Sequence, residues 1–201
     1  ALRKGSLTLD TQLPVSRYAS TRAPSKLGLS PGSTISVEDA ILGIVTRSAN
    51  DAATVLAEAI GGTEEDFGFL MTAKARELGI TIFSSPFDET AVDLLAGLDA
   101  PAYKIASFEV IDLPLIRYVA KQGKPMIIST GMANLGEIQE GVETARSNGA
   151  GGVALLHCTS AYPAPIEEAN VRTVAHLGQA FNVVSGLSDH APGSAACVAS
   201  I

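Results

Sequence analysis

Polar side chains with catalytic potential recur in the second half of this 201-residue chain, where short apolar segments end. The segment 101–109 carries Lys104 and Ser107, and residues three apart lie on opposite faces of a regular strand. Both can serve one site only if Ser107 lies at or beyond the strand end. An apolar strand that delivers polar groups at its C-terminal tip is how parallel α/β sheets and barrels build active sites.

Further segments end in the same way. Ser85, Ser129, His157 and Ser188 each follow or close an apolar stretch, and His190 comes two residues after Ser188. These groups converge only if the sheet curves, as it does in a barrel. Taken alone, each serine fits a turn or a helix cap better than a site, and His157 fits buried packing equally well. The repetition carries the prediction.

Alternating strands and helices over residues 81–201 would position these tips. The predicted strands are 81–84, 102–106, 125–129, 153–157 and 182–186, and the predicted helices are 89–98, 113–122, 135–147, 170–180 and a segment after 192. This alternation indicates βα units and a parallel sheet. The expected fold class is therefore α/β: an incomplete (β/α) TIM-type barrel of about five parallel strands.

Residues 1–80 follow a different pattern. A stretch rich in Ser, Thr, Pro and Gly predicts short strands or loops up to Ser36. Three consecutive helices are predicted after it, the second capped by 48–51 and the third ending at Gly79. We therefore divide the chain into a mainly helical segment, 1–80, and a partial barrel, 81–201.

Five ordered motifs in residues 81–200 resemble the sialic acid (N-acetylneuraminate) synthase family, which condenses phosphoenolpyruvate with an N-acetylated sugar such as N-acetylmannosamine. The motifs are Ser85-Pro86-Phe87-Asp88, Pro101 to Ser107, Gly123 to Met132, Leu155 to Pro165 and Gly186 to His190. The resemblance implies a cytoplasmic transferase of carbohydrate biosynthesis. It also implies that the five predicted strands are barrel strands three to seven.

The resemblance gives roles to individual residues. Lys104, Ser107, Ser129 and Ser188 would hold the phosphate and carboxylate of phosphoenolpyruvate, and Ser85 takes the place of another hydroxyl residue of that pocket. A dianionic phosphate needs a lysine charge and several hydroxyl or backbone donors, which this set would supply.

The resemblance also implies sugar and metal contacts. Tyr162 would contact the amino sugar, Ser160 stands where some members carry Asn, and His190 would be one of two ligands of Mn²⁺ or Mg²⁺. The second metal histidine, the first two strands and the C-terminal antifreeze-like domain of the bacterial enzymes have no counterpart in this sequence. A hard divalent cation needs several ligands. We therefore expect weak or no condensation activity from this chain.

Residues 1–78 resemble a second family, the serine-type D-alanyl-D-alanine carboxypeptidases (penicillin-binding proteins). Ser48 and Asn50 match that family's Ser-x-Asn element. The family also needs a nucleophile in a Ser-x-x-Lys element, and no Ser here has Lys three residues later. The alternative is that Ser48 and Asn50 merely cap a helix. The sequence thus indicates a chimera joined near 77–81, with a carboxypeptidase fragment and a folded chimera without activity as alternative interpretations.

Composition limits the partners. The net charge of -7 argues against nucleic acid or an anionic membrane. Cys158 and Cys197 do not have a metal-like spacing. A sheet cut from a barrel has two edges and an open face, so we expect a homo-oligomer that takes small-molecule substrates.

Overall fold

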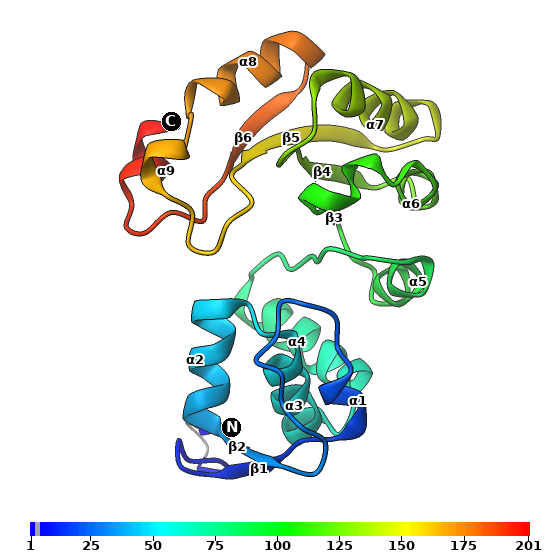
Figure 1. Cartoon of the computed structure of the whole chain (residues 1–201). Helices are drawn as coiled ribbons and strands as arrows, with labels where there is room; N and C mark the ends of the chain where they lie inside the picture. Colours follow the sequence, from blue (N-terminus) through cyan, green and yellow to red (C-terminus); the bar gives the residue numbers. More distant parts are fainter. Residues whose placement is uncertain (3–4) are drawn as a thin grey trace. The chain divides into compact units, whose positions relative to one another are not determined.

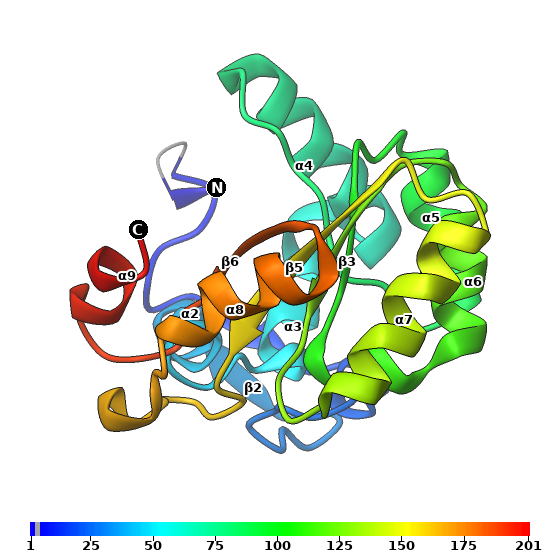
Figure 2. The same cartoon turned by 90° about the horizontal axis from the view of Figure 1, so that it is seen from above.

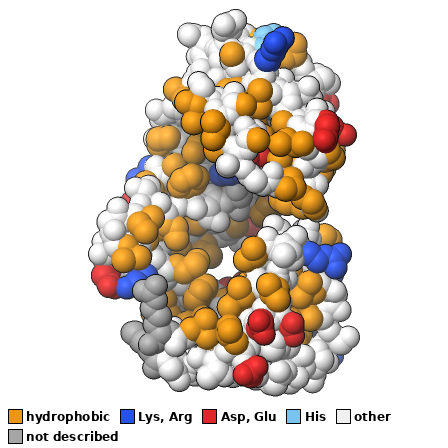
Figure 3. Space-filling view, turned by 90° about the vertical axis from the view of Figure 1, so that its left-hand side faces the viewer, with side chains coloured by type: hydrophobic (Ala, Val, Ile, Leu, Met, Phe, Trp, Pro, Cys, Tyr) orange, Lys and Arg blue, Asp and Glu red, His pale blue; other side chains and the backbone are white. Residues whose placement is uncertain are grey.

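The computed structural model describes residues 1–2 and 5–201, and the chain divides into two units, Ala1–Gly79 and Ile80–Ile201 (Figure 1). The first unit is mainly helical, and the second alternates strands and helices. Within the described residues, no helix is both long and apolar enough to cross a membrane. Figure 3 shows hydrophobic side chains on the surface of each unit.

The first unit combines a short antiparallel strand pair with helices. Its elements are β1 (Gln12–Pro14), α1 (Arg17–Ser20), β2 (Thr34–Ser36), α2 (Val37–Arg47), α3 (Asn50–Gly61) and α4 (Glu64–Leu78). Ser36 and Thr63 start α2 and α4, because each side chain accepts a hydrogen bond from the backbone N–H three residues later. The three consecutive helices predicted after Ser36 are confirmed.

The predicted cap of the second helix is wrong. Ser48 ends α2 in the left-handed region, with φ of 50°, and Ala49 precedes α3 without a side-chain hydrogen bond. Asn50 and Asp51 already belong to α3, and their side chains hold a preceding loop: the Asn50 amide donates to the Ala23 carbonyl at 3.1 Å. Tertiary contacts with that loop thus replace the local cap.

A buried carboxylate holds the same loop. Asp51 is 0% exposed and accepts hydrogen bonds from the N–H groups of Leu27, Gly28 and Leu29 at 2.9, 2.9 and 3.0 Å. Burial alone raises the pKa of a carboxyl, but these donors and the N–H of Ala52 outweigh it, so the pKa of Asp51 lies below its ordinary value.

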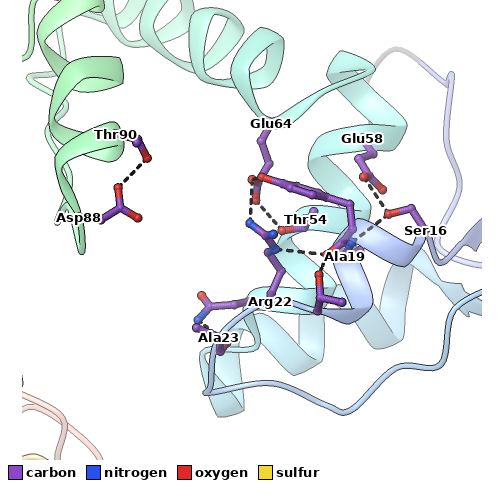
Figure 4. A network of polar contacts seen from close by, with 12 residues as sticks. Ser16, Ala19, Arg22, Ala23, Thr54, Glu58, Glu64, Asp88 and Thr90 are labelled. Carbon is purple, nitrogen blue, oxygen red and sulfur yellow. Dashed lines mark hydrogen bonds and ion pairs between the residues drawn. The ribbon is translucent and has the colours of Figure 1, made fainter.

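Glu64, at the start of α4, is the centre of a second network in this unit (Figure 4). Its carboxylate accepts hydrogen bonds from the Tyr18 hydroxyl at 2.6 Å and the Thr54 hydroxyl at 2.5 Å. The Arg22 guanidinium lies 3.7 Å from the same carboxylate and 3.6 Å from the centre of the Tyr18 ring. The hydrogen bond to Glu64 raises the pKa of Tyr18. These contacts join α1 to α3 and α4.

The second unit contains a parallel sheet in the order β3-β4-β5-β6. The strands are β3 (Tyr103–Ile105), β4 (Pro125–Ser129), β5 (Gly152–Cys158) and β6 (Val184–Ser188); the helices are α5 (Glu89–Gly97), α6 (Leu113–Ala120), α7 (Leu135–Ser147), α8 (Arg172–Phe181) and α9 (Ala195–Ala199), with short 3₁₀ turns η2 (Ser107–Ile111) and η3 (Ile166–Glu168). The predicted α/β class and parallel sheet are confirmed.

The number of strands differs from the prediction. The described sheet has four strands rather than five, because segment 81–84 contributes one parallel bridge, between Ser84 and Tyr103. β3 is itself only three residues long, and its neighbour Phe83 is exposed. A three-residue edge strand such as β3 has few backbone N–H and C=O groups with which segment 81–84 could pair.

The two faces of the sheet differ. Tyr103, Ile105, Ile128 and Leu155 are at most 1% exposed and pack with side chains of α5, α6, α7 and α8 in one core. Figure 2 shows α5, α6 and α7 beside one another along the sheet. Because side chains alternate along a strand, Lys104 lies on the opposite face, in register with Ile127 and Ala154. Ser129 and Ser188 alternate onto the same face as Lys104, which these helices leave open, whereas His157 shares the face of Leu155.

Candidate functional site

The end of β3 explains how Lys104 and Ser107, three residues apart, can lie in one site. Ser107 lies beyond the end of β3, as the first residue of η2, so strand alternation does not separate it from Lys104. The backbone N–H of Lys104 donates to Ser84 at 3.1 Å, which fixes the strand edge. No carboxylate among the described residues is within ion-pair distance of the Lys104 ammonium, so its charge is available to an anion.

The turn after β4 joins the tips of β3 and β5. Gly131 has φ of +44°, and a Cβ atom built on it would lie 2.7 Å from Ser107 Oγ and 2.9 Å from Ser160 Oγ. Two hydroxyl groups from different loops therefore flank one backbone position. Both were predicted as substrate contacts, and the structure brings them together.

Ser129 is placed differently from its neighbours. It is 1% exposed, and its hydroxyl has no hydrogen-bond partner among the described residues. The adjacent Thr130 donates two hydrogen bonds to the Leu156 carbonyl, one from its N–H (2.9 Å) and one from its hydroxyl (3.2 Å). An unpaired buried hydroxyl is rare in folded proteins. The Ser129 hydroxyl can therefore donate a hydrogen bond, but it is buried from solvent in this structure.

His190 is held in one orientation after β6. Its Nδ1 lies 3.2 Å from the Thr159 carbonyl, and a carbonyl only accepts, so a neutral imidazole here has its proton on Nδ1 and its lone pair on Nε2. The Tyr162 ring stacks on the imidazole with centroids 4.3 Å apart. Cys158 Sγ lies 3.9 Å from both His190 Nδ1 and Ser160 Oγ, which links His190 to the turn at Gly131.

Ser188 belongs to a small pocket beside His190. The pocket is lined by Thr159, Ala164, Pro165, Ala169, Leu187, Ser188, Asp189, His190 and Ala191. The N–H of Ala164 donates to the His190 carbonyl at 3.0 Å, so the loop after β5 is fastened to the tip of β6. Burial, with Cys158 nearby, raises the pKa of Tyr162 on the same loop.

The metal prediction is not matched by a complete ligand set. Over residues 1–2 and 5–201, no group of three or more His, Cys, Asp or Glu side chains could hold a metal ion. His190 offers one nitrogen, and Asp189 Oδ1 already accepts from the N–H of Ala191 at 2.9 Å. A hard cation such as Mg²⁺ or Mn²⁺ takes several oxygen ligands. These residues therefore do not fit such a site.

The remaining predicted residues are Ser85 in the second unit and Ser48 and Asn50 in the first. Ser85 is half-buried, and its hydroxyl has no hydrogen bond within the described part of the chain. Ser48 and Asn50 are exposed residues of the other unit, and the Asn50 amide is occupied by Ala23.

Glu109 is a candidate that was not among the predicted site residues. It lies in η2, two residues after Ser107, and its Oε2 is buried without a partner among the described residues. Burial raises its pKa, and the nearby charge of Asp112 adds to the effect. The sequence shows a Glu beside a predicted tip, but the burial that perturbs it depends on how η2 packs.

Comparisons with known proteins agree with the strand-tip motifs. Residues 47–201 match the NeuB family. The chain is 48% identical over 120 residues to pseudaminic acid synthase of Helicobacter pylori, which covers 60% of this chain and 35% of that protein. It also matches the crystal structure of N-acetylneuraminic acid (sialic acid) synthetase from Leptospira borgpetersenii in complex with citrate, with 26% identity and a TM-score of 0.64 over 72% of this chain and 50% of that one.

A further match concerns the second predicted resemblance. The D-alanyl-D-alanine carboxypeptidase of Francisella tularensis is 37% identical over 39% of this chain and 19% of its own, with a TM-score of 0.38. That score is too low to support a conclusion, so the carboxypeptidase resemblance stays a prediction. The family match begins at residue 47, before the predicted junction near 77–81, and therefore includes α3 and α4.

The chain thus spans about a third of the H. pylori synthase and half of the L. borgpetersenii chain. The motifs at the ends of β3, β4, β5 and β6 lie within the matched range, and the predicted resemblance to sialic acid synthases is confirmed. The chain belongs to the NeuB family.

Proposed function

We propose that this chain is the phosphoenolpyruvate-binding part of a synthase that makes a sugar acid of the sialic or pseudaminic type. The observation that carries the proposal is the meeting of Ser107 and Ser160 at Gly131, on a sheet whose open face holds Lys104, which forms no ion pair with the described residues. The family match and the names of the two synthases described above support it. We further propose that the sheet is part of a (β/α) barrel.

The reaction of such a synthase joins two substrates. Carbon 3 of phosphoenolpyruvate forms a bond to the aldehyde carbon of an N-acetylated sugar, whose aldehyde oxygen becomes a hydroxyl. Water adds at carbon 2 and inorganic phosphate leaves, which gives a 2-keto acid. The protein must therefore hold a highly charged anion close to a neutral sugar.

The strand tips are suited to the anion. Lys104 supplies a positive charge, and the hydroxyls of Ser107 and Ser160 supply donors from two sides. A hydrogen bond in which the donor or the acceptor is ionised is about twice as strong as one between neutral groups, so the neutral hydroxyls also bind an anion well. Ser188 and Ser85 would extend the donor set, and Ser129 would join it if the tip opens to the ligand.

The sugar would lie toward His190. Tyr162 is 58% exposed on the loop after β5 and presents its ring beside the imidazole, where it can contact an uncharged sugar. Nε2 of His190 is free to accept a hydrogen bond from a sugar hydroxyl. Glu109, with its raised pKa, is a candidate to hold a proton near the anion.

Calorimetric titration of the whole chain with phosphoenolpyruvate tests the proposal. We expect saturable binding that weakens tenfold or more in Lys104→Ala, because a charge-assisted hydrogen bond contributes about 1.5–3 kcal/mol. Lys124→Ala is the matched control: it also removes one lysine of the second unit, but one that pairs with Asp99 at 3.2 Å. Absence of binding, or equal loss in both variants, would contradict the proposal.

The condensation itself is a separate measurement. We expect little or no consumption of phosphoenolpyruvate by this chain with N-acetylmannosamine and Mn²⁺, because the described residues do not supply a metal site. Rapid metal-dependent turnover would show that this expectation is wrong while leaving the binding proposal intact.

A further inference from the structure

We infer that Gly131 is a positioning residue: the absence of a side chain there lets the tips of β3 and β5 close on the turn after β4, and so sets the spacing of the Ser107 and Ser160 hydroxyls. The identity of the ligand that these hydroxyls bind rests on the proposed function. The spacing itself rests on contacts within the chain.

The first contact is with Ser107. A Cβ atom on Gly131 would lie 2.4 Å from Ser107 Cβ, and side-chain carbons do not approach one another closer than 3.0 Å. Ser107 cannot relieve this by changing its rotamer, because its Cβ is fixed to the backbone of η2. Ser107 is 8% exposed, and η2 packs against α6 and α7, which limits its retreat.

The turn that carries Gly131 is also fixed. Both the N–H and the hydroxyl of Thr130 donate to the Leu156 carbonyl of β5, and the N–H of Ala133 donates to the Thr130 carbonyl at 2.9 Å. Gly131 therefore cannot back away from Ser107 without breaking hydrogen bonds to a neighbouring strand. A larger residue must push the tips apart instead.

The backbone conformation adds a second requirement. Gly131 has φ of +44°, in the left-handed region that favours glycine. Gly131→Ala would strain the backbone and also crowd the added methyl group against Ser107. A control variant must separate these two effects. Gly123 provides it: its φ is +69°, yet a Cβ there would meet nothing within 4 Å. Gly123→Ala has the strain without the crowding.

The experiment compares Gly131→Ala with Gly123→Ala in the full chain. Phosphoenolpyruvate affinity is measured by calorimetry, and the Cβ resonances of Ser107 and Ser160 are followed by NMR with ¹³C-labelled serine. We expect Gly131→Ala to weaken binding at least tenfold relative to Gly123→Ala and to shift both serine resonances. Unchanged resonances in a folded Gly131→Ala variant would overturn the inference.

Two further outcomes remain decisive. If the unmodified chain binds no phosphoenolpyruvate, the proposed function fails, but the serine resonances still test the spacing. If Gly131→Ala unfolds, the double variant Gly131→Ala/Ser107→Gly removes the Cβ and hydroxyl that would clash. Recovery of folding in the double variant supports crowding at Ser107, and failure to recover while Gly123→Ala stays folded overturns it.

Discussion

Tyr162 and His190 stack on one another, with ring centroids 4.3 Å apart and an angle of 30° between the planes. Tyr162 comes from the loop after β5, and His190 follows β6. The carbonyl of Thr159, 3.2 Å from Nδ1, favours the Nδ1–H tautomer, and the stacked tyrosine ring holds the plane of the imidazole.

Removal of the ring should release this histidine. We expect Tyr162→Ala to give a mixture of His190 tautomers in ¹⁵N NMR spectra of the imidazole, whereas the unmodified chain and Tyr162→Phe show the Nδ1–H form. Phenylalanine keeps the stacked ring and lacks the hydroxyl, so it is the matched control. An unchanged spectrum for Tyr162→Ala would mean that Thr159 alone holds the ring.

Asp51 should stabilise the first unit strongly. Asp51→Ala removes a carboxylate that accepts from three loop N–H groups and leaves those donors without their acceptor. We expect a loss of about 3 kcal/mol in the free energy of unfolding at neutral pH, since hydrogen bonds to charged groups contribute about 1.5–3 kcal/mol. Urea denaturation of the two proteins measures this difference.

The contribution of Asp51 should also depend on pH. Its pKa is lowered in the folded state, so the stabilisation is fully present above the unfolded-state pKa of about 3.9 and is lost as pH falls through the lower folded value. We therefore expect the difference between the unmodified chain and Asp51→Ala to shrink in acid. A difference that stays constant down to pH 2 would contradict this assignment.

Glu109 should behave in the opposite sense. Burial raises its pKa, so the folded state holds the proton more tightly, and stability falls as pH rises from the unfolded value toward the folded one. We expect Glu109→Gln to raise the melting temperature at pH 7 and to flatten its pH dependence above about pH 4.3, the unfolded value. A lower melting temperature at pH 7 would indicate that the ionised carboxylate is stabilising.

The open face of the sheet predicts self-association. Val184 of the edge strand β6 is 76% exposed, and the backbone of an edge strand can pair with another chain. We expect a homo-oligomer in light scattering coupled to size-exclusion chromatography. A monodisperse monomer at about 100 µM would contradict this expectation.

Local sequence signals predicted the helices and the parallel strands well. Ser36 and Thr63 cap their helices through contacts three residues away, which a sequence displays directly. The same reasoning failed at Ser48, because the side chains after it bond to a distant loop. It also failed for segment 81–84, whose pairing depends on the length of β3.

The candidate site was predictable in part. The motifs placed Lys104, Ser107, Ser160 and His190 near strand ends, since strand periodicity and polar tips are visible in the sequence. The burial of Ser129 and Glu109 was not visible, because it arises from packing between elements. The crowding at Gly131 was also hidden, as it depends on two loops meeting at one turn.

The most direct test of the central claim is an NMR titration of the ¹⁵N-labelled chain with phosphoenolpyruvate. We expect saturable shifts concentrated at the amides of Ser107, Gly131 and Ser160, with little change in residues 1–79. Shifts scattered over both units, or none at millimolar ligand, would contradict an anion site at the strand tips.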